Sequence, residues 1–307
     1  MNEGTRIKLL LMISFVVLSG TAFMQRTAFA GDDAGNSTRF SIEECLPLAE
    51  QGDADAQFDL GRMYYNGHGV PQDYKEAAKW FRKAAEQGDA NAQSGLGIVY
   101  FYGIGVPQDY KEAMEWCRKA AEQGVSTAHF FLGFMYYNGQ GVPQDYKEAA
   151  KWFRKAAEQG DADAQCMLGT MYRDGHGVLQ DYKEAVNWYR KAEEQGVAGA
   201  QYFLGFMYRD GHGVPQDYKE AAKWFRKAAE QGDAGAQFFL GIMYRDGHGV
   251  LQDYVESYAW LNISAAQGDE NISEVRDAVV EKLSLDALAK AQELSKEYYK
   301  KYVEPFQ

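Results

Sequence analysis

The sequence predicts an all-α solenoid, and three observations lead to this fold class. A segment beginning Gly67-His68-Gly69 and ending at Tyr74 recurs, with changes, every 36 residues. Each 36-residue unit holds two apolar patterns at helical spacing, separated by this glycine-rich turn. The six tryptophans are spaced evenly, one per unit. Repeats of 20–50 residues are typical of solenoids, in which each unit buries its apolar face against its neighbours.

The first thirty residues predict a secretory signal peptide. Arg6 and Lys8 precede a short apolar run, and Ala28-Phe29-Ala30 offers a signal-peptidase site. The run is shorter than the roughly 20 residues that span a bilayer. We expect cleavage after Ala30, with Ala22 as a second possible site and a retained N-terminal anchor as the alternative. Residues 31–40 are small and polar, which predicts a flexible linker. The mature chain is then expected in the periplasm or outside the cell, without stable membrane insertion.

Composition excludes several classes of protein. The 307 residues carry a formal charge of −12, which argues against a nucleic-acid binder because such proteins need a basic face. Three cysteines predict no disulfide framework. The sequence lacks G-x-S-x-G, H-E-x-x-H and S-x-x-K motifs, so we expect no enzyme and no cofactor.

Each repeat reads as a helix, a turn and a second helix. In the first repeat Asp53 is expected to cap the first helix, and Gly67 to end it. Asp73 starts the second helix, with Glu76 completing a capping-box-like pair. Gly61 lies inside the first helix, where glycine costs about 1 kcal/mol relative to alanine. Its recurrence predicts a close helix crossing that leaves no room for a Cβ. The predicted repeats are 53–88, 89–124, 125–160, 161–196, 197–232 and 233–268.

These residues resemble the Sel-like repeat (SLR) family of tetratricopeptide-like solenoids. The resemblance rests on Leu60-Gly61, Tyr64, the Gly67–Val70 turn, Trp80 and the Ala84-Ala85-x-x-Gly88 ending, which recur through about two-thirds of the chain. It implies a right-handed α-solenoid that serves as an adaptor or interaction scaffold. Some family members are disulfide-rich and associated with β-lactams, but their regular cysteine pairs are missing here.

Both ends of the array are expected to be capped. Residues 41–52 match the second half of a repeat, and 269–307 predict two further helices, about 271–282 and 286–302. The tryptophans are expected to be equivalent buried residues. Loss of Trp152, in mid-array, should therefore cost about 3–5 kcal/mol, while loss of Trp260 should only fray the end.

Histidine and cysteine residues give no convincing metal or catalytic site. His68, His176, His212 and His248 share one turn position, but stacked helices lie about 8–10 Å apart, too far for one zinc ion to bridge two repeats. We therefore expect them to be solvent-exposed turn residues and predict no metal. His129 has no obvious partner in the sequence.

The first-helix stripe holds the candidate partner-binding residues. In tetratricopeptide-like folds this stripe resembles the concave groove. Its third position is aromatic in the first three repeats and arginine in the last three. Aromatic residues and arginine are enriched at binding hot spots. Two alternatives remain: positions 58 and 62 and their equivalents pack between neighbouring first helices, or Asp174, Asp210 and Asp246 neutralise the arginines. The candidates are Phe58, Tyr65, Phe101, Phe130, Phe134, Tyr137, Arg173, Tyr202, Phe206, Arg209 and Arg245.

The functional prediction is an exported scaffold that binds a protein or peptide partner in this groove. Acidic residues of the partner are expected to face the three arginines. The first alternative is an envelope accessory or β-lactam-binding protein of the same family. A second is an endoplasmic-reticulum adaptor, although the C-terminal residues carry no retention signal.

Overall fold

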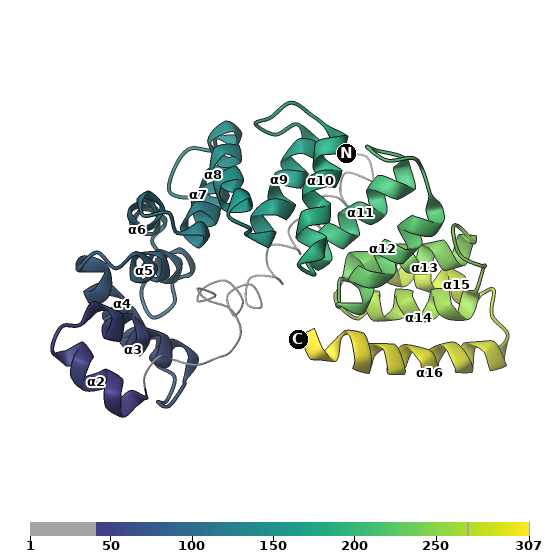
Figure 1. Ribbon diagram of the computed structural model, residues 1–307. Coiled ribbons are helices and arrows are strands. Elements are labelled where there is room, and N and C mark those ends of the chain that lie inside the picture. Colours follow the sequence, from purple (N-terminus) through teal and green to yellow (C-terminus); the bar gives the residue numbers. More distant parts are fainter. Residues whose placement is uncertain (1–40, 269, 307) are drawn as a thin grey trace. The chain divides into compact units, whose positions relative to one another are not determined.

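The computed structural model describes residues 41–268 and 270–306 of the chain (Figure 1). The predicted signal peptide and linker lie outside the described residues. The described part is all-helical, with fifteen α-helices and one short 3-10 helix. It falls into two compact units. We call residues 41–164 with 176–178 the N-terminal unit, and 165–175 with 179–306 the C-terminal unit.

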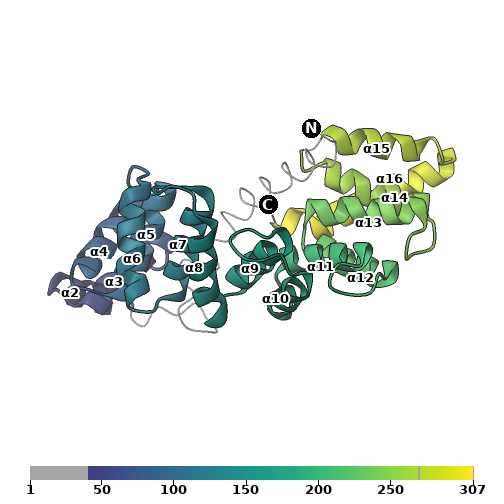
Figure 2. The same cartoon turned by 90° about the horizontal axis from the view of Figure 1, so that it is seen from above.

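Six helical hairpins follow one another in tandem, and the predicted repeat fold is confirmed. The hairpins are α3 (Ala54–Asn66) with α4 (Tyr74–Glu86), α5 (Ala90–Tyr102) with α6 (Tyr110–Glu122), α7 (Ser126–Asn138) with α8 (Tyr146–Glu158), α9 (Ala162–Asp174) with α10 (Tyr182–Glu194), α11 (Ala198–Asp210) with α12 (Tyr218–Glu230), and α13 (Ala234–Asp246) with α14 (Tyr254–Ala265). Within the N-terminal unit, Figure 2 shows the hairpins side by side, and α4 contacts α5 as α6 contacts α7.

The expected capping residues begin and end the helices. The Asp53 carboxylate accepts the Ala56 amide at 2.8 Å, and Gly67 ends α3 with a left-handed φ of +72°. Asp73 accepts the amides at the start of α4. The expected capping-box bond from the Asp73 N–H to the Glu76 carboxylate is not formed. The Asp73 N–H donates to the Tyr64 carbonyl instead, and the Glu76 carboxylate accepts from Lys79 Nζ. In the third and fifth repeats a valine occupies the N-cap, without a side-chain cap.

The close crossing inside each hairpin is confirmed. A Cβ on Gly61 would lie 2.6 Å from Phe81 Cδ1, which belongs to the second helix of the same hairpin. A Cβ built on each of the five equivalent glycines would lie 2.5–2.8 Å from the nearest side-chain atom of the second helix. These atoms belong to Cys117, Phe153, Tyr189, Phe225 and Leu261. Because ordinary carbon contacts lie at about 3.5–4.0 Å, only glycine fits here without a shift of the partner.

The expectation of six equivalent tryptophans is wrong in detail. Trp80, Trp116 and Trp260 are buried, whereas Trp152, Trp188 and Trp224 are partly exposed. A lysine one turn later covers the ring in each of the first five repeats. The ammonium groups of Lys83, Lys119, Lys155, Lys191 and Lys227 lie 3.8–4.2 Å from the ring centroids. One lysine of each of these second helices therefore covers aromatic surface.

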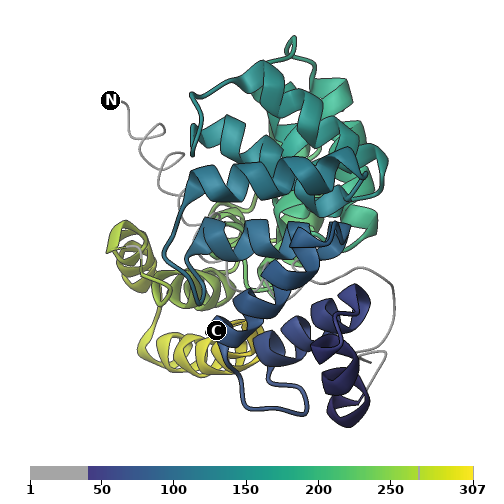
Figure 3. The ribbon, with the colours of Figure 1, turned by 90° about the vertical axis from the view of Figure 1, so that its left-hand side faces the viewer.

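Helices outside the repeats close the two ends of the array. Helix α2 (Ile42–Glu50) begins with a Ser41–Glu44 capping box, and its Cys45 thiol donates to the Ala56 carbonyl at 3.1 Å. At the other end α15 (Glu270–Val280) and α16 (Leu285–Tyr302) both pack on α14, followed by the 3-10 helix η1 (Glu304–Phe306). Figure 3 shows α16 in yellow, leading to the C-terminal end of the chain. The two predicted C-terminal helices are therefore present.

Candidate functional site

Four of the candidate residues in the N-terminal unit are buried packing residues. Tyr65, Phe101, Phe130 and Tyr137 are at most 8% exposed. The third position of the stripe packs edge-on against the tyrosine that opens the second helix of its own hairpin. Ring centroids lie 5.3 Å apart for Tyr65–Tyr74, 5.3 Å for Phe101–Tyr110 and 5.0 Å for Tyr137–Tyr146. These third-position rings therefore pack within their own hairpins, against the second helix.

Phe58 and Phe134 are the partly exposed candidates of the same unit. Phe58 lies 5.8 Å from Phe81, and the Arg62 guanidinium lies 5.8 Å above the Phe58 ring. Phe134 contacts Phe101 and Phe130 with centroids 5.9 and 6.2 Å apart. These two rings are therefore the accessible edge of a largely buried aromatic layer.

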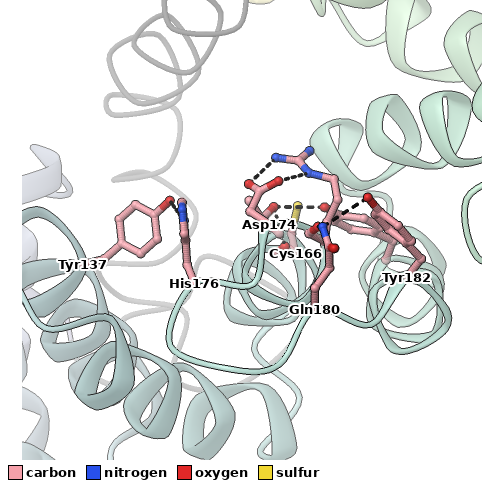
Figure 4. A network of polar contacts seen from close by, with 9 residues as sticks. Tyr137, Cys166, Asp174, His176, Gln180 and Tyr182 are labelled. Atoms are coloured by element: carbon pink, nitrogen blue, oxygen red, sulfur yellow. Dashed lines mark hydrogen bonds and ion pairs between the residues drawn. The ribbon is translucent and has the colours of Figure 1, made fainter. Parts of the chain in front are cut away.

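In the C-terminal unit the three arginines pair with the aspartate that follows each of them. Arg173 donates from Nε and Nη2 to both carboxylate oxygens of Asp174, at 2.8 and 2.7 Å (Figure 4). Arg209–Asp210 and Arg245–Asp246 repeat this geometry at 2.7–2.9 Å. The expected row of positive charge is therefore neutralised locally.

Each of these ion pairs leaves one edge of the guanidinium open. Toward the described residues, Nη1 of the three arginines makes no hydrogen bond, and the side chains are 19, 32 and 37% exposed from Arg173 to Arg245. The aspartate fixes the plane of the guanidinium through two parallel bonds. Nη1 is therefore the guanidinium nitrogen whose hydrogen-bonding capacity remains for a further acceptor.

Aromatic rings lie directly beneath two of the guanidinium groups. Arg173 lies 4.4 Å from the Phe203 centroid, and Arg209 lies 4.4 Å from Phe206 and 5.3 Å from Phe239. Tyr202 meets Phe206 edge-on at 4.8 Å, and both rings are partly exposed. The candidates Tyr202, Phe206 and Arg209 thus form one cluster on α11, which we call the α11 cluster.

Three of the four turn histidines stack on a tyrosine of the preceding repeat. His248 is exposed as expected, whereas His68, His176 and His212 are only partly exposed. His212 stacks on Tyr182 of the preceding repeat at 4.4 Å, and His248 stacks on Tyr218 at 5.3 Å. In the N-terminal unit His176 stacks on Tyr146 at 4.5 Å, and its Nδ1 lies 3.4 Å from the Tyr137 hydroxyl (Figure 4). The second glycine of the turn makes this approach possible, because a Cβ on Gly213 would lie 2.3 Å from the Tyr182 carbonyl oxygen.

His129 does have partners, and they belong to a motif that sequence reasoning missed. In the other five repeats the equivalent residue is a glutamine that accepts a bond from a second glutamine 30 residues later, at 2.8–2.9 Å. Three of these inner glutamines also donate to a carbonyl of the preceding helix, at 3.0–3.1 Å. We call this the glutamine ladder. Its signal was visible in the sequence, as two glutamines per repeat at fixed spacing.

The buried thiols are poor nucleophiles. Burial raises the pKa of Cys45 to about 11 and that of Cys117 to about 12, so both stay protonated at neutral pH. All three cysteines are buried. In residues 41–268 and 270–306, no group of three or more His, Cys, Asp or Glu side chains is placed to hold a metal ion. Among the helices that the structure describes, none has the length and apolar character needed to cross a bilayer.

Comparison with known proteins identifies the repeat. A family model described as Sel1 repeat matches residues 54–89, 90–125, 126–161, 162–197, 198–233 and 234–269. A solved Sel1 repeat protein from Oxalobacter formigenes is 32% identical, with 81% of this chain and 95% of that chain covered and a TM-score of 0.68. A protective antigen of uropathogenic Escherichia coli with an SLR fold is 26% identical over 97% and 95% of the chains, with a TM-score of 0.39. No match is found among curated proteins.

Proposed function

Because the chain belongs to the Sel1 repeat family, whose repeats generally mediate protein–protein interaction, we propose that it is an exported scaffold that binds a segment of a partner protein along its first helices. The observation that carries the proposal is the recurrence of one arrangement in three consecutive repeats. In each, an Arg–Asp pair stands where the earlier repeats have a buried ring, and each guanidinium keeps an open edge. The packing of the hairpins does not by itself require an Arg–Asp pair in place of a buried ring.

The α11 cluster defines what the partner segment must offer. Tyr202 and Phe206 present ring surface for an apolar side chain, and Arg209 presents its Nη1 edge to an oxygen acceptor. Tyrosine, phenylalanine and arginine side chains of this kind supply most of the energy at many interfaces. Because each arginine charge is offset by its own aspartate, acceptors such as backbone carbonyls suit the site as well as carboxylates do. We expect the binding to depend only weakly on salt.

The remaining candidates divide into contact and supporting residues. Phe58 and Phe134, on the N-terminal unit, are partly exposed and are proposed to make an apolar contact of their own with the partner. Arg173 and Arg245 are proposed to hold the partner on either side of the α11 cluster. The four buried residues of the stripe, Tyr65, Phe101, Phe130 and Tyr137, support the surface from beneath.

Export is the second part of the proposal and rests on the sequence of residues 1–30. The basic start, the short apolar run and the Ala28-Phe29-Ala30 site together support cleavage after Ala30. Mass spectrometry of the protein recovered from outside the cytoplasm should find Gly31 as the first residue. An intact Met1 in the membrane fraction would support the anchor instead.

The binding proposal is tested by removing the open guanidinium edges. The triple variant Arg173→Ala, Arg209→Ala and Arg245→Ala should keep its helical content, because these side chains lie outside the hairpin cores. Proteins captured by the parent chain and identified by mass spectrometry should be retained at least about tenfold less well by the variant. The loss should persist at high salt, because local neutralisation leaves little long-range charge to screen.

A charge-matched control separates the site from net charge. Lys111, Lys183 and Lys219 are exposed at the starts of second helices, and their replacement by alanine removes the same three charges elsewhere. This control should bind the captured partner as the parent does. Equal binding by the folded arginine variant would contradict the proposed site, and loss of binding in both variants would indicate a nonspecific charge effect.

A further inference from the structure

The glutamine ladder has one irregular step, at His129 in the third repeat. The inner glutamines of the ladder are at most 6% exposed, and His129 is 4% exposed at the same position of helix α7. Gln93, its counterpart one repeat earlier, donates to the Ala85 carbonyl at 3.1 Å and accepts from the Gln123 amide at 2.9 Å. A neutral glutamine side chain therefore satisfies both neighbours at any pH.

At His129 both ring nitrogens face oxygen atoms. Nε2 lies 3.1 Å from the Ala121 carbonyl oxygen, on helix α6 of the second repeat, and Nδ1 lies 3.4 Å from Gln159 Oε1, just after α8. Gln159 Nε2 donates to the Gly124 carbonyl at 3.1 Å, which turns its oxygen toward the ring. A carbonyl can only accept, so Nε2 carries the proton of the neutral ring. Nδ1 and Gln159 Oε1 then meet as two acceptors.

A protonated ring would place a charge in an unfavourable environment. Trp152 of α8 stacks on the imidazole with centroids 5.6 Å apart, and the Lys155 ammonium lies 4.1 Å from the Trp152 ring. From α6 the ring meets the neutral Ala121 carbonyl, and from the turn after α8 it meets the neutral Gln159 amide. Among the described residues, the charge that acts on the ring is therefore that of Lys155, which is of the same sign as an imidazolium.

We propose that His129 makes the junction between the second and third repeats sensitive to acid, so that protonation of its ring loosens the packing of α7 on α6. The bonds from His129 to Ala121 and from Gln159 to Gly124 join the two repeats, and all these residues lie within the N-terminal unit. Protonation would supply the missing hydrogen to the Gln159 contact. It would also bury a cation that Lys155 repels, and for a side chain this buried the desolvation cost is the larger effect.

The direction in which the pKa of His129 is shifted supports a loss of stability in acid. Burial, with a contribution from Lys155, lowers the pKa of His129 below its ordinary value of 6.5. A histidine whose folded-state pKa is lowered stabilises the fold above the unfolded-state pKa, and that stability is lost as the pH falls through and below it. Each unit of lowering corresponds to a tenfold loss in the local closing equilibrium once the pH is below both values.

The test compares the full mature chain with His129→Gln, which restores the residue of the other five repeats. Hydrogen–deuterium exchange of the amides from Val125 to Phe131, corrected for intrinsic rates, should accelerate in the parent as the pH falls from 7.5 to 5. The acceleration should be absent in His129→Gln. The matched control is His68→Gln, because the third repeat already carries Gln140 in that turn position. It should keep the pH profile of the parent.

A second measurement does not depend on a variant folding. An NMR titration of the His129 ring signals in the parent chain should give a midpoint below 6.5. A midpoint at or above 6.5 would overturn the proposal, as would identical exchange profiles for the parent and His129→Gln. Phe130 and Phe134 follow on the same helix, so an acid effect on partner binding would also be expected. That consequence rests on the proposed function, whereas the exchange and NMR results do not.

Discussion

Replacement of Gly133 by alanine should destabilise the third hairpin, although alanine is the better helix former. Its Cβ would lie 2.7 Å from Phe153 Cδ1 and 2.9 Å from Cε1. Because carbon atoms pack at about 3.5–4.0 Å, the ring must move by about 1 Å. Phe153 is fully buried, and protein cores contain few voids into which a ring could move.

The expected magnitude is the difference of two opposing terms. Overpacking of a filled core costs about 1–3 kcal/mol. Alanine in place of glycine in a helix interior gains about 1 kcal/mol. We therefore expect Gly133→Ala to lower the free energy of unfolding by about 1 kcal/mol, measured by urea denaturation with circular dichroism and tryptophan fluorescence.

A double-mutant cycle makes the steric origin testable. In the Phe153→Ala background, itself destabilised by about 3–5 kcal/mol, the obstructing ring is gone. Gly133→Ala should then become stabilising by up to about 1 kcal/mol, so that the sign of its effect reverses. If Gly133→Ala is neutral or stabilising in the parent chain, or keeps its sign in the Phe153→Ala background, the crossing is not set by this contact.

Two further predictions concern buried polar groups of the C-terminal unit. Gln237 is fully buried, donates to the Ala229 carbonyl and accepts from Gln267, so Gln237→Leu should cost about 1–3 kcal/mol in a urea denaturation experiment by leaving two polar groups unpaired. Burial raises the pKa of Asp233 to about 6, so stability should fall as the pH rises from about 4 to 6. Asp233→Asn keeps a capping oxygen without a titrating group and should not show this fall. Parallel pH profiles of the two proteins would contradict the assignment.

The fold could be predicted because its determinants are local and periodic. The sequence of one repeat is enough to recognise the capping aspartates, the turn glycines and the apolar stripe of each helix. Six copies make the pattern unambiguous. The internal glycine at position 61 and its equivalents also revealed the helix crossing, because its cost in a helix demands a packing reason. The contact partner, Phe81 or its equivalent, is simply the apolar residue 20 positions later.

The candidate site could be predicted only in part, because a helical stripe does not show what covers it. Tyr65 and Tyr137 share a face with accessible residues, yet the tyrosine that opens each second helix buries them. The Arg173–Asp174 pairing depends on side-chain geometry between neighbours in sequence, which helical spacing does not settle. His129 seemed isolated because its partners lie 8 and 30 residues away.

The structure reverses the expected order of importance of Trp152 and Trp260. That order assumed that the six tryptophans are equally buried, so that only their position in the array matters. Trp260 is 1% exposed, its indole N–H donates to Glu256 at 3.1 Å, and Tyr298 and Tyr302 of α16 lie 4.6 and 5.5 Å from its ring. Trp152 is partly exposed, and within the described residues its buried indole N–H has no hydrogen-bond partner. The terminal tryptophan is therefore the better packed of the two.

Trp260→Ala should accordingly be the more damaging substitution. It removes a fully buried ring, for which a loss of about 3–5 kcal/mol is expected, and it takes away the surface on which α16 packs. Trp152→Ala should cost about 2 kcal/mol or less, because part of its ring already faces water and its unpaired N–H is removed with it. Urea denaturation gives the two free energies, and hydrogen exchange of the α16 amides reports whether that helix detaches in Trp260→Ala alone. A larger loss for Trp152→Ala, or an α16 that stays protected without Trp260, would show that position in the array outweighs burial.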